Sequence, residues 1–361
     1  MAKAQDRDLE LKLRFRRVLF QQGYWCPIEV ELSQYEALST SVKRVSLTDL
    51  DVLGVKYDLF FTPFRVVGDC KSGRNVSEVS RLFWLKGISS FFGTDQAYLI
   101  HSTIKTHTRG IAPKLGLRVL DEMALFTLEK NLEVEKLYLP LADTSMHQAI
   151  VDLWGIEVGK GQKPTEQQLQ LKEVYAYLAY SYWYIEQYRN LLNVISHFAG
   201  IAPLLDSQNP AHVLLAYAGL ARFVHSLLET ASFVFAQGGT NVPRDARHYI
   251  FGGPLALKER ERFFELLRNL TNSNEQLDPP YLPDVIELLG RMIQNPAGAC
   301  DVLRHIDAVY LWMESLKNDT LPPLDGEAHN TAAIVLMRNA AQTFARITGV
   351  KEAIYAAIIA L

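Results

Sequence analysis

The fold of this chain of 361 residues is decided by two stretches, Leu47-Thr48-Asp49-Leu50-Asp51-Val52-Leu53-Gly54 and Val66-Val67-Gly68-Asp69-Cys70-Lys71-Ser72-Gly73. Each is an apolar, β-branched run typical of a strand, with an acidic side chain at or near its end. A buried carboxylate without a partner is costly, so something must compensate these charges. In a hairpin, the interval of 18 residues brings Asp51 and Asp69 to neighbouring positions. Lys71 points to the same face as Asp69, because side chains alternate with period two.

The residues around these stretches predict a mixed α/β region. Its expected order is helix, three strands, helix, strand, helix, strand. Ser77 is a typical N-cap for the second helix, and glycine follows where this helix should stop. The expected elements are a helix over 9–20, strands over 28–32, 45–55 and 59–70, a helix from 77 to 93, a strand over 97–101, a short helix over 111–115 and an extended segment over 117–120.

Strand signals fade beyond residue 141, and long helical patterns follow. The expected helices cover 166–197, 211–236, 257–270, 283–293, 299–316 and 328–361. We therefore predict two domains, an α/β domain over 1–140 and an all-helical domain over 141–361. The helical domain is expected to regulate, to oligomerise or to recognise a partner protein.

The composition indicates an ordinary globular protein. Hydrophobic residues make up 48% and charged residues 21%, with a formal net charge of −3. These values argue against a disordered, fibrous or highly cationic chain. The three cysteines are too few and too scattered for a disulfide framework, and they lack the paired spacing of a zinc site, so we expect a cytoplasmic protein.

No membrane attachment is expected from the sequence. The charged N-terminus lacks the apolar stretch of a secretory signal. The most apolar segment, 211–236, is interrupted by Arg222, His225 and Glu229, and such groups are costly inside a bilayer. We interpret this segment as a buried helix, with the three polar residues on its solvated side or, alternatively, in a polar site.

Two carboxylates beside an ammonium group suit a hard divalent cation. Mg²⁺ prefers carboxylate and carbonyl oxygens and keeps several waters for a substrate phosphate, and Mn²⁺ can replace it. Lys71 would then orient or deprotonate the attacking water, or neutralise charge that grows on the phosphate. Phosphodiester hydrolysis is the reaction that this set of residues favours. The alternative is a structural cluster of ion pairs with no catalysis.

The pattern of Asp51 followed by Asp69-Cys70-Lys71 resembles the PD-(D/E)XK nucleases, the restriction-endonuclease-like superfamily, over residues 8–125. The resemblance implies a core of helix, three strands, helix and strand with a mixed central sheet. It implies Mg²⁺ held by Asp51, Asp69 and the backbone carbonyl of Cys70, with Glu10 of the first helix as a further catalytic and metal-binding carboxylate. This sequence departs from the family pattern in having Leu50 before Asp51, and Asp69 where glutamate is commoner.

The resemblance also implies a substrate and a setting. Arg74, Arg81 and Lys86 match positions that commonly contact phosphates, and each has an ordinary solvated helix face as its alternative reading. DNA is the favoured substrate, with RNA as the alternative, and relatives with appended domains often serve restriction, phage defence or repair. Cutting both strands usually takes two sites, which makes a homodimer plausible. The rival function is an inactive nuclease-fold scaffold that binds a protein or nucleic-acid partner.

An aromatic cluster marks the helical part of the sequence. Aromatic residues at helical spacing usually pack in a core or interface, which is the interpretation we favour, with stacking on nucleic-acid bases as the alternative. The cluster consists of Tyr175, Tyr177, Tyr180, Tyr182, Trp183, Tyr184 and Tyr188.

Overall fold

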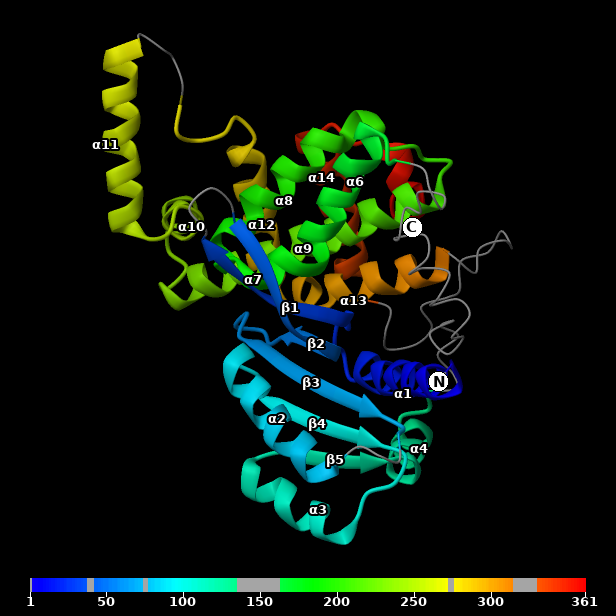
Figure 1. Cartoon of the computed structure of the whole chain (residues 1–361). Helices are drawn as coiled ribbons and strands as arrows, with labels where there is room; N and C mark the ends of the chain where they lie inside the picture. Colours follow the sequence, from blue (N-terminus) through cyan, green and yellow to red (C-terminus); the bar gives the residue numbers. More distant parts are fainter. Residues whose placement is uncertain (1, 38–41, 74–76, 135–162, 272–275, 314–329) are drawn as a thin grey trace.

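The computed structural model describes residues 2–37, 42–73, 77–134, 163–271, 276–313 and 330–361. An N-terminal α/β region, built of a helix and a five-stranded mixed sheet, is followed by a mostly helical region (Figure 1). The predicted combination of α/β and helical parts is therefore confirmed at this level. The predicted domain boundary at 140/141 lies outside the described residues.

The sheet has the strand order β1-β2-β3-β4-β5. The first three strands are antiparallel neighbours, whereas β3, β4 and β5 run parallel. A helix lies between β3 and β4, a short helix lies between β4 and β5, and a further helix follows β5. The order up to β5 is the one expected from the sequence. The elements are α1 (Ala2–Gln21), β1 (Ile28–Ala37), β2 (Val42–Tyr57), β3 (Pro63–Lys71), α2 (Glu78–Phe92), β4 (Gln96–His101), α3 (Thr106–Ile111), η1 (Ala112–Leu115), β5 (Arg118–Asp121) and α4 (Glu122–Asn131).

Local chemistry fixes the ends of these elements. The Ser77 side chain accepts a hydrogen bond from the backbone N–H of Ser80 at the start of α2, as predicted, and Gly93 ends this helix with a φ of 72°. The third strand begins later than predicted. The Asp58 carboxylate accepts the backbone N–H groups of Phe60 and Thr62, and this tight turn occupies the residues before Pro63.

Helix α1 lies against the sheet next to Asp69. A Cβ atom at Gly68 would come within 2.6 Å of the Phe15 ring, so only glycine permits this close approach. Phe15 and the neighbouring Leu11, Val18 and Leu19 are buried in this contact. Because α1 lies this close to the sheet, its polar side chains come to lie beside the C-terminal end of β3.

The helical region contains two breaks that the sequence patterns did not predict. The expected helix over 166–197 is interrupted after Tyr184, where Ile185 is extended with a ψ of 148°. The Asn190 side chain donates to the carbonyl oxygen of Tyr182 and stabilises this break. The expected helix over 328–361 stops at Gly349, which adopts a φ of 76°.

The helical elements are α6 (Glu166–Ala176), the π-helical turn η4 (Tyr177–Ser181), α7 (Tyr182–Tyr184), α8 (Gln187–Ile201), η5 (Ala202–Leu204), α9 (Pro210–Ala236), α10 (Val242–Ile250), α11 (Pro254–Thr271), α12 (Leu282–Gln294), α13 (Pro296–Met313), α14 (Thr331–Thr348), η7 (Glu352–Tyr355) and α15 (Ala356–Ile359).

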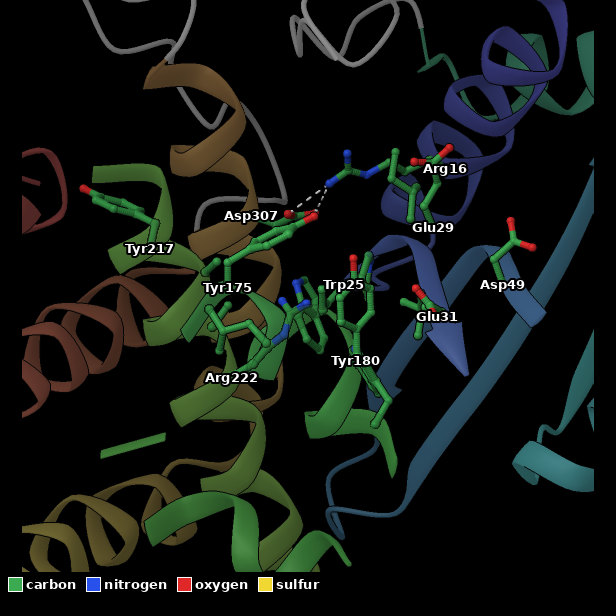
Figure 2. A pocket seen from close by; sticks show the side chains of 18 of the residues that line it. Arg16, Trp25, Glu29, Glu31, Asp49, Tyr175, Tyr180, Tyr217, Arg222 and Asp307 are labelled. Carbon is green, nitrogen blue, oxygen red and sulfur yellow. Dashed lines mark hydrogen bonds and ion pairs between the residues drawn. The ribbon is translucent and has the colours of Figure 1, made fainter. Parts of the chain in front are cut away.

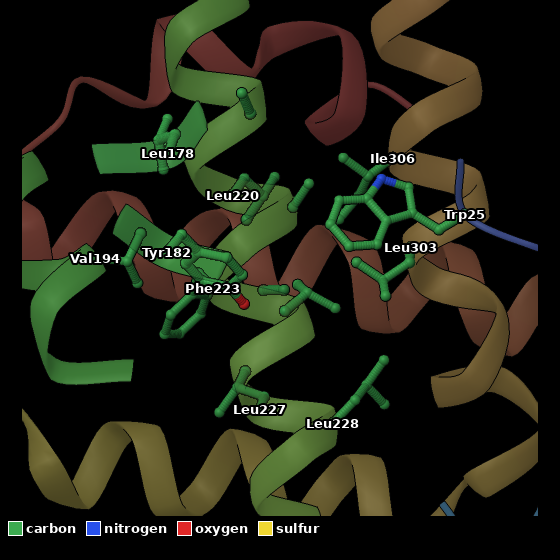
Figure 3. Close-up of a cluster of buried hydrophobic side chains, with 14 of the residues drawn as sticks. Trp25, Leu178, Tyr182, Val194, Leu220, Phe223, Leu227, Leu228, Leu303 and Ile306 are labelled. Atoms are coloured by element: carbon green, nitrogen blue, oxygen red, sulfur yellow. The ribbon is translucent and has the colours of Figure 1, made fainter. Parts of the chain in front are cut away.

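Helix α9 is the central helix of the hydrophobic core (Figure 3). It is the one described helix that is long and apolar enough to cross a membrane, and 83% of its most apolar window is buried inside the molecule. The predicted burial of this helix is confirmed. The prediction of a solvated side is wrong, because His225 and Glu229 are buried as well, and they bond with residues of neighbouring elements.

One hydrophobic core extends through both regions. Trp25 and Leu53 of the α/β region belong to the same buried cluster as Leu228 and Ile306 of the helical region. Figure 3 shows the Trp25 indole beside Ile306 of α13. The β1–β2 edge of the sheet faces the helices, whereas β5 lies at the far edge (Figure 1).

Candidate active site

Asp51, Asp69 and Lys71 lie together at the end of β3. The register that pairs Val52 with Gly68 sets the next residues, Asp51 and Asp69, side by side on adjacent strands. The Lys71 Nζ atom is 3.0 Å from Asp51 Oδ2 and 3.8 Å from Asp69 Oδ1. The sequence suggested that Asp51 lies at or near the end of its strand. Asp51 instead lies in the middle of β2, because β2 continues along β1 beyond the end of β3.

Two helices add further cations to this cluster. Lys12 of α1 places its Nζ atom 2.8 Å from Asp51 Oδ1. Arg81 of α2 donates from Nε to Asp69 Oδ2 at 2.8 Å and from Nη2 to Asp69 Oδ1. The guanidinium of Arg81 also stacks on the Trp84 ring, with its centre 3.8 Å from the ring centroid. Three cations therefore surround two carboxylates.

The two carboxylates differ in their proton affinity. Both are buried, with exposed fractions of 3% for Asp51 and 1% for Asp69. Burial disfavours the ionised form of Asp51, but the nearby Lys12 and Lys71 and the backbone N–H of Cys70 hold its pKa below the ordinary value. Burial raises the pKa of Asp69, and repulsion by Asp51 adds to this rise against the opposing effect of Arg81.

The donor set matches a hard cation. Among the residues that the structure describes, no three His, Cys, Asp or Glu side chains gather as metal ligands. The cluster itself contains two side-chain carboxylates, those of Asp51 and Asp69. The backbone N–H of Cys70 donates to the Asp51 carboxylate at 2.7 Å. Because the N–H and C=O groups of a strand residue point to the same neighbouring strand, the Cys70 carbonyl also points toward β2. Two carboxylates and one carbonyl are ligands of the kind that Mg²⁺ takes together with several waters. All four carboxylate oxygens bond with Lys12, Lys71 or Arg81 in this structure, so a metal ion would have to displace at least one of these cations.

The Cys70 side chain takes no part in such a set. The thiol is fully buried, and burial followed by repulsion from Asp51 and Asp69 raises its pKa well above the ordinary value. The group therefore stays a neutral thiol at physiological pH, and only its backbone atoms face the two aspartates.

Glu10 is not brought to the cluster. It is exposed, and it lies two residues from Lys12, which puts it on the other side of α1. Asp8 occupies the site-facing side instead, since residues four apart share a helix face. Its Oδ1 atom accepts the backbone N–H of Ser72 at 2.6 Å and the Ser72 hydroxyl at 2.5 Å. The carboxylate of α1 that bonds with the residue after Lys71 is therefore Asp8.

The three predicted phosphate contacts have different outcomes. Arg81 lies in the cluster as the partner of Asp69. Lys86 is exposed, and its Nζ atom reaches toward Gly116, which precedes β5, so it lies toward the opposite end of the parallel strands from Lys71. Arg74 lies outside the described residues.

Lys12 and Asp8 are members of the site that the sequence motif did not predict. A signal for Lys12 was present, because Lys12 and Arg16 interrupt the apolar side of α1 that Leu11, Phe15 and Leu19 form. A charged side chain inside the buried face of a helix must meet an opposite charge on the neighbouring element. The identity of that partner depends on how α1 crosses the sheet, which local patterns do not reveal.

No known protein family, no curated protein and no solved structure matches this chain. A functional assignment therefore depends on the chemistry of the cluster formed by Asp51, Asp69, Lys71, Lys12 and Arg81, and on the α/β framework that holds it.

Proposed function

We propose that this chain is a metal-dependent nuclease of the PD-(D/E)XK type that hydrolyses phosphodiester bonds, with DNA as the favoured substrate and RNA as the alternative. One observation carries the proposal: the Lys71 ammonium lies 3.0 Å and 3.8 Å from two buried carboxylates on adjacent strands. The order of helix, three antiparallel strands, helix and parallel strand supports the same assignment.

Each residue of the cluster has a role in this proposal. Asp51, Asp69 and the Cys70 carbonyl would hold Mg²⁺, which supplies Lewis acidity to the scissile phosphate when it is bound. Lys71 is partly exposed, with 24% of its side chain accessible, so it can orient the attacking water and neutralise charge on the phosphate. Lys12 keeps Asp51 ionised from the buried side.

Arg81 has two possible partners in this proposal. Its guanidinium now bonds with both oxygens of Asp69, and its side chain is 24% exposed. A guanidinium binds phosphate in the same bidentate geometry as a carboxylate. A substrate phosphate can therefore draw Arg81 away from Asp69 and leave that carboxylate to a metal ion.

A second candidate function is a scaffold without catalysis. One observation favours it: all four carboxylate oxygens of Asp51 and Asp69 accept a bond from Lys12, Lys71 or Arg81. Such a network is complete without a metal ion. In this case the aromatic helices would bind a protein or nucleic-acid partner, and the cluster would only join α1 and α2 to the sheet.

Cleavage assays separate the two functions. Purified protein is incubated with supercoiled plasmid, linear duplex, single-stranded DNA or RNA in the presence of Mg²⁺, Mn²⁺ or EDTA. We expect metal-dependent cleavage that is lost in Lys71→Ala and Asp69→Asn but kept in Lys130→Ala, an exposed lysine on α4. The absence of cleavage on every substrate, together with the absence of Mn²⁺ binding, would overturn the nuclease proposal and favour the scaffold function.

A further inference from the structure

A cavity of about 560 Å³ lies between the β1–β2 hairpin and the helices α6, α9 and α13 (Figure 2). It is open to solvent and has no role in the nuclease proposal. Its walls carry aromatic rings from both regions of the molecule, namely Trp25 before β1, Tyr175 and Tyr180 of the α6–η4 segment, and Trp183 of α7. A pocket of this volume lined by rings is typical of a site for a small planar group.

The polar groups of the cavity are divided between donors and acceptors. Arg16 is 5% exposed, and its Nη2 atom bonds with both oxygens of Asp307 at 3.1 Å, but its buried Nε atom has no acceptor within the described chain. The buried Nε1 atom of Trp183 has none either. Neither nitrogen has surface accessible to solvent, so neither contacts the open space of the cavity. The cationic side chains of Arg16 and Arg222 are the groups of the lining that favour acceptor atoms on a ligand.

The opposite wall offers carboxylates. Glu29 and Glu31 of β1 and Asp49 of β2 line the cavity, and Glu31 is directly paired with Asp49 in the strand register. Glu31 accepts a hydrogen bond from the Ser33 hydroxyl at 3.2 Å. The carboxylates of this wall are acceptors for N–H donors of a ligand. Glu29 also adopts a φ of 52°, a left-handed conformation that is strained for a glutamate and is typical of functional positions.

A nucleobase has the combination of properties that the cavity demands. It is flat and stacks on aromatic side chains, and its edges carry both acceptor atoms and N–H donors. The lining holds two arginines and four carboxylates, Arg222 and Asp307 among them, which leaves two negative charges. This charge disfavours a ligand whose phosphates enter the cavity. We propose that the cavity is a binding site for a nucleobase, carried by a free nucleoside or by an unpaired position of a nucleic acid.

The side chain of Lys12 contacts both the wall of the cavity and the candidate active site. Glu29 in its wall accepts a bond from Lys12 Nζ at 3.2 Å, and the same Nζ atom lies 2.8 Å from Asp51. Asp49 lies two residues before Asp51 and on the same face of β2. Lys12 therefore links the wall of the cavity to a carboxylate of the candidate active site. The binding of a base goes beyond the proposed nuclease and does not require it.

The test uses the full chain in EDTA, so that no cleavage can occur. Quenching of tryptophan fluorescence, to which Trp25 and Trp183 in the cavity contribute, reports binding of adenosine, guanosine, cytidine and uridine. A second titration compares a duplex that has one unpaired base with a fully paired duplex. We expect saturable binding in at least one of the two titrations, with a dissociation constant below about 1 mM.

Variants locate the binding. Tyr180→Ala removes one ring and should weaken binding at least about fivefold, because stacking on one ring is worth about 1 kcal/mol or more. Tyr184→Ala is the matched control, since this tyrosine is 45% exposed and lies outside the cavity lining. Asp49→Asn changes an exposed carboxylate at the rim, so it should leave the fold intact and weaken binding at least about fivefold.

Each outcome decides the proposal. Saturable binding of nucleosides that Tyr180→Ala and Asp49→Asn weaken assigns a free nucleoside. A preference for the unpaired base over the paired duplex, lost in the same variants, assigns the nucleic acid as the source. The proposal is overturned if neither titration saturates, or if Tyr184→Ala weakens binding as much as Tyr180→Ala. Because the assay contains no metal, a failure here leaves the cleavage result of Lys71→Ala untouched, and the reverse also holds.

Discussion

In the proposed nuclease, the partner of Asp69 would decide whether this carboxylate can bind a metal ion. Arg81 bonds with both carboxylate oxygens and stacks on Trp84, so it holds Asp69 in a closed state. A ligand that binds only the open state has its affinity reduced by the fraction of molecules that are open. The protein without nucleic acid should therefore bind a divalent ion more weakly than its two buried aspartates alone would suggest.

We predict that Arg81→Met tightens the binding of Mn²⁺ in the absence of nucleic acid roughly tenfold, because the open fraction then approaches one. Titration calorimetry measures the dissociation constant, and Arg291→Met is the control, since Arg291 pairs with Glu287 on the surface of α12. An unchanged dissociation constant would mean that Arg81 and the metal ion do not compete. Arg81 would then be a structural partner of Asp69 only.

His225 of α9 is a buried neutral histidine at the junction between the sheet and the helices. Burial, followed by the positive charges of Arg65 and Arg222, lowers its pKa well below the ordinary value of 6.5. Its Nδ1 atom lies 2.6 Å from the Tyr182 hydroxyl, and its Nε2 atom is 3.7 Å from Glu229. Glu229 is in turn bonded to the Tyr57 hydroxyl at 2.6 Å. The folded state therefore excludes a proton that the unfolded chain accepts.

The sign of the pH effect follows from this difference. Below about pH 6.5 the unfolded chain binds one proton more than the folded chain at this position. The free energy of unfolding therefore decreases as the pH is lowered, by up to about 1.4 kcal/mol for each pH unit. Urea denaturation at about pH 7 and at about pH 5.5 measures the decrease in the free energy of unfolding between these two conditions. We predict that this decrease is smaller for His225→Gln than for the natural protein. His107→Gln, a change at an exposed histidine of α3, should leave the loss unchanged.

At the scale of elements, α1 joins the site to the rest of the fold. Lys12 connects it to Asp51 and Glu29, whereas Arg7 forms an exposed pair with Glu122 of α4. Removing one member of a buried pair leaves an uncompensated charge, but an exposed pair contributes little. We predict that Lys12→Met lowers the free energy of unfolding by about 3 kcal/mol, and Arg7→Met by less than about 1 kcal/mol. Urea denaturation of both variants measures the two losses, and equal losses would contradict the buried pairing.

The same element shows how far the sequence alone can lead. The interval from Asp51 to Asp69 predicted their proximity, because an antiparallel hairpin converts spacing into register. The capped helix α2 was equally predictable, since Ser77 and Gly93 act locally. The partner of Arg16 was not, because Asp307 lies 291 residues away and only the packing of α13 brings it near. The break after Tyr184 likewise depends on a tertiary bond, from Asn190.

At the scale of the whole molecule, the α/β and helical regions depend on each other. Trp25, Leu53 and Tyr57 of the α/β region are buried in the core that they share with α9 and α13. The buried Arg16–Asp307 pair crosses the same boundary. A fragment that ends at the boundary expected from the sequence would expose this apolar surface and leave Arg16 without its carboxylate, and both changes are costly.

We therefore predict that the full chain unfolds in a single cooperative transition, and that fragment 1–140 does not fold alone. Far-ultraviolet circular dichroism and tryptophan fluorescence should give coincident urea transitions for the full chain, which is the signature of one cooperative unit. The fragment should lack near-ultraviolet signals and bind hydrophobic dyes, as loosely packed states do. Two separate transitions, or a fragment that unfolds cooperatively, would mean that the shared core contributes little to stability. The cluster around Asp51 would then be able to form without the helices, and the cavity between the two regions would be the part of the molecule that depends on their association.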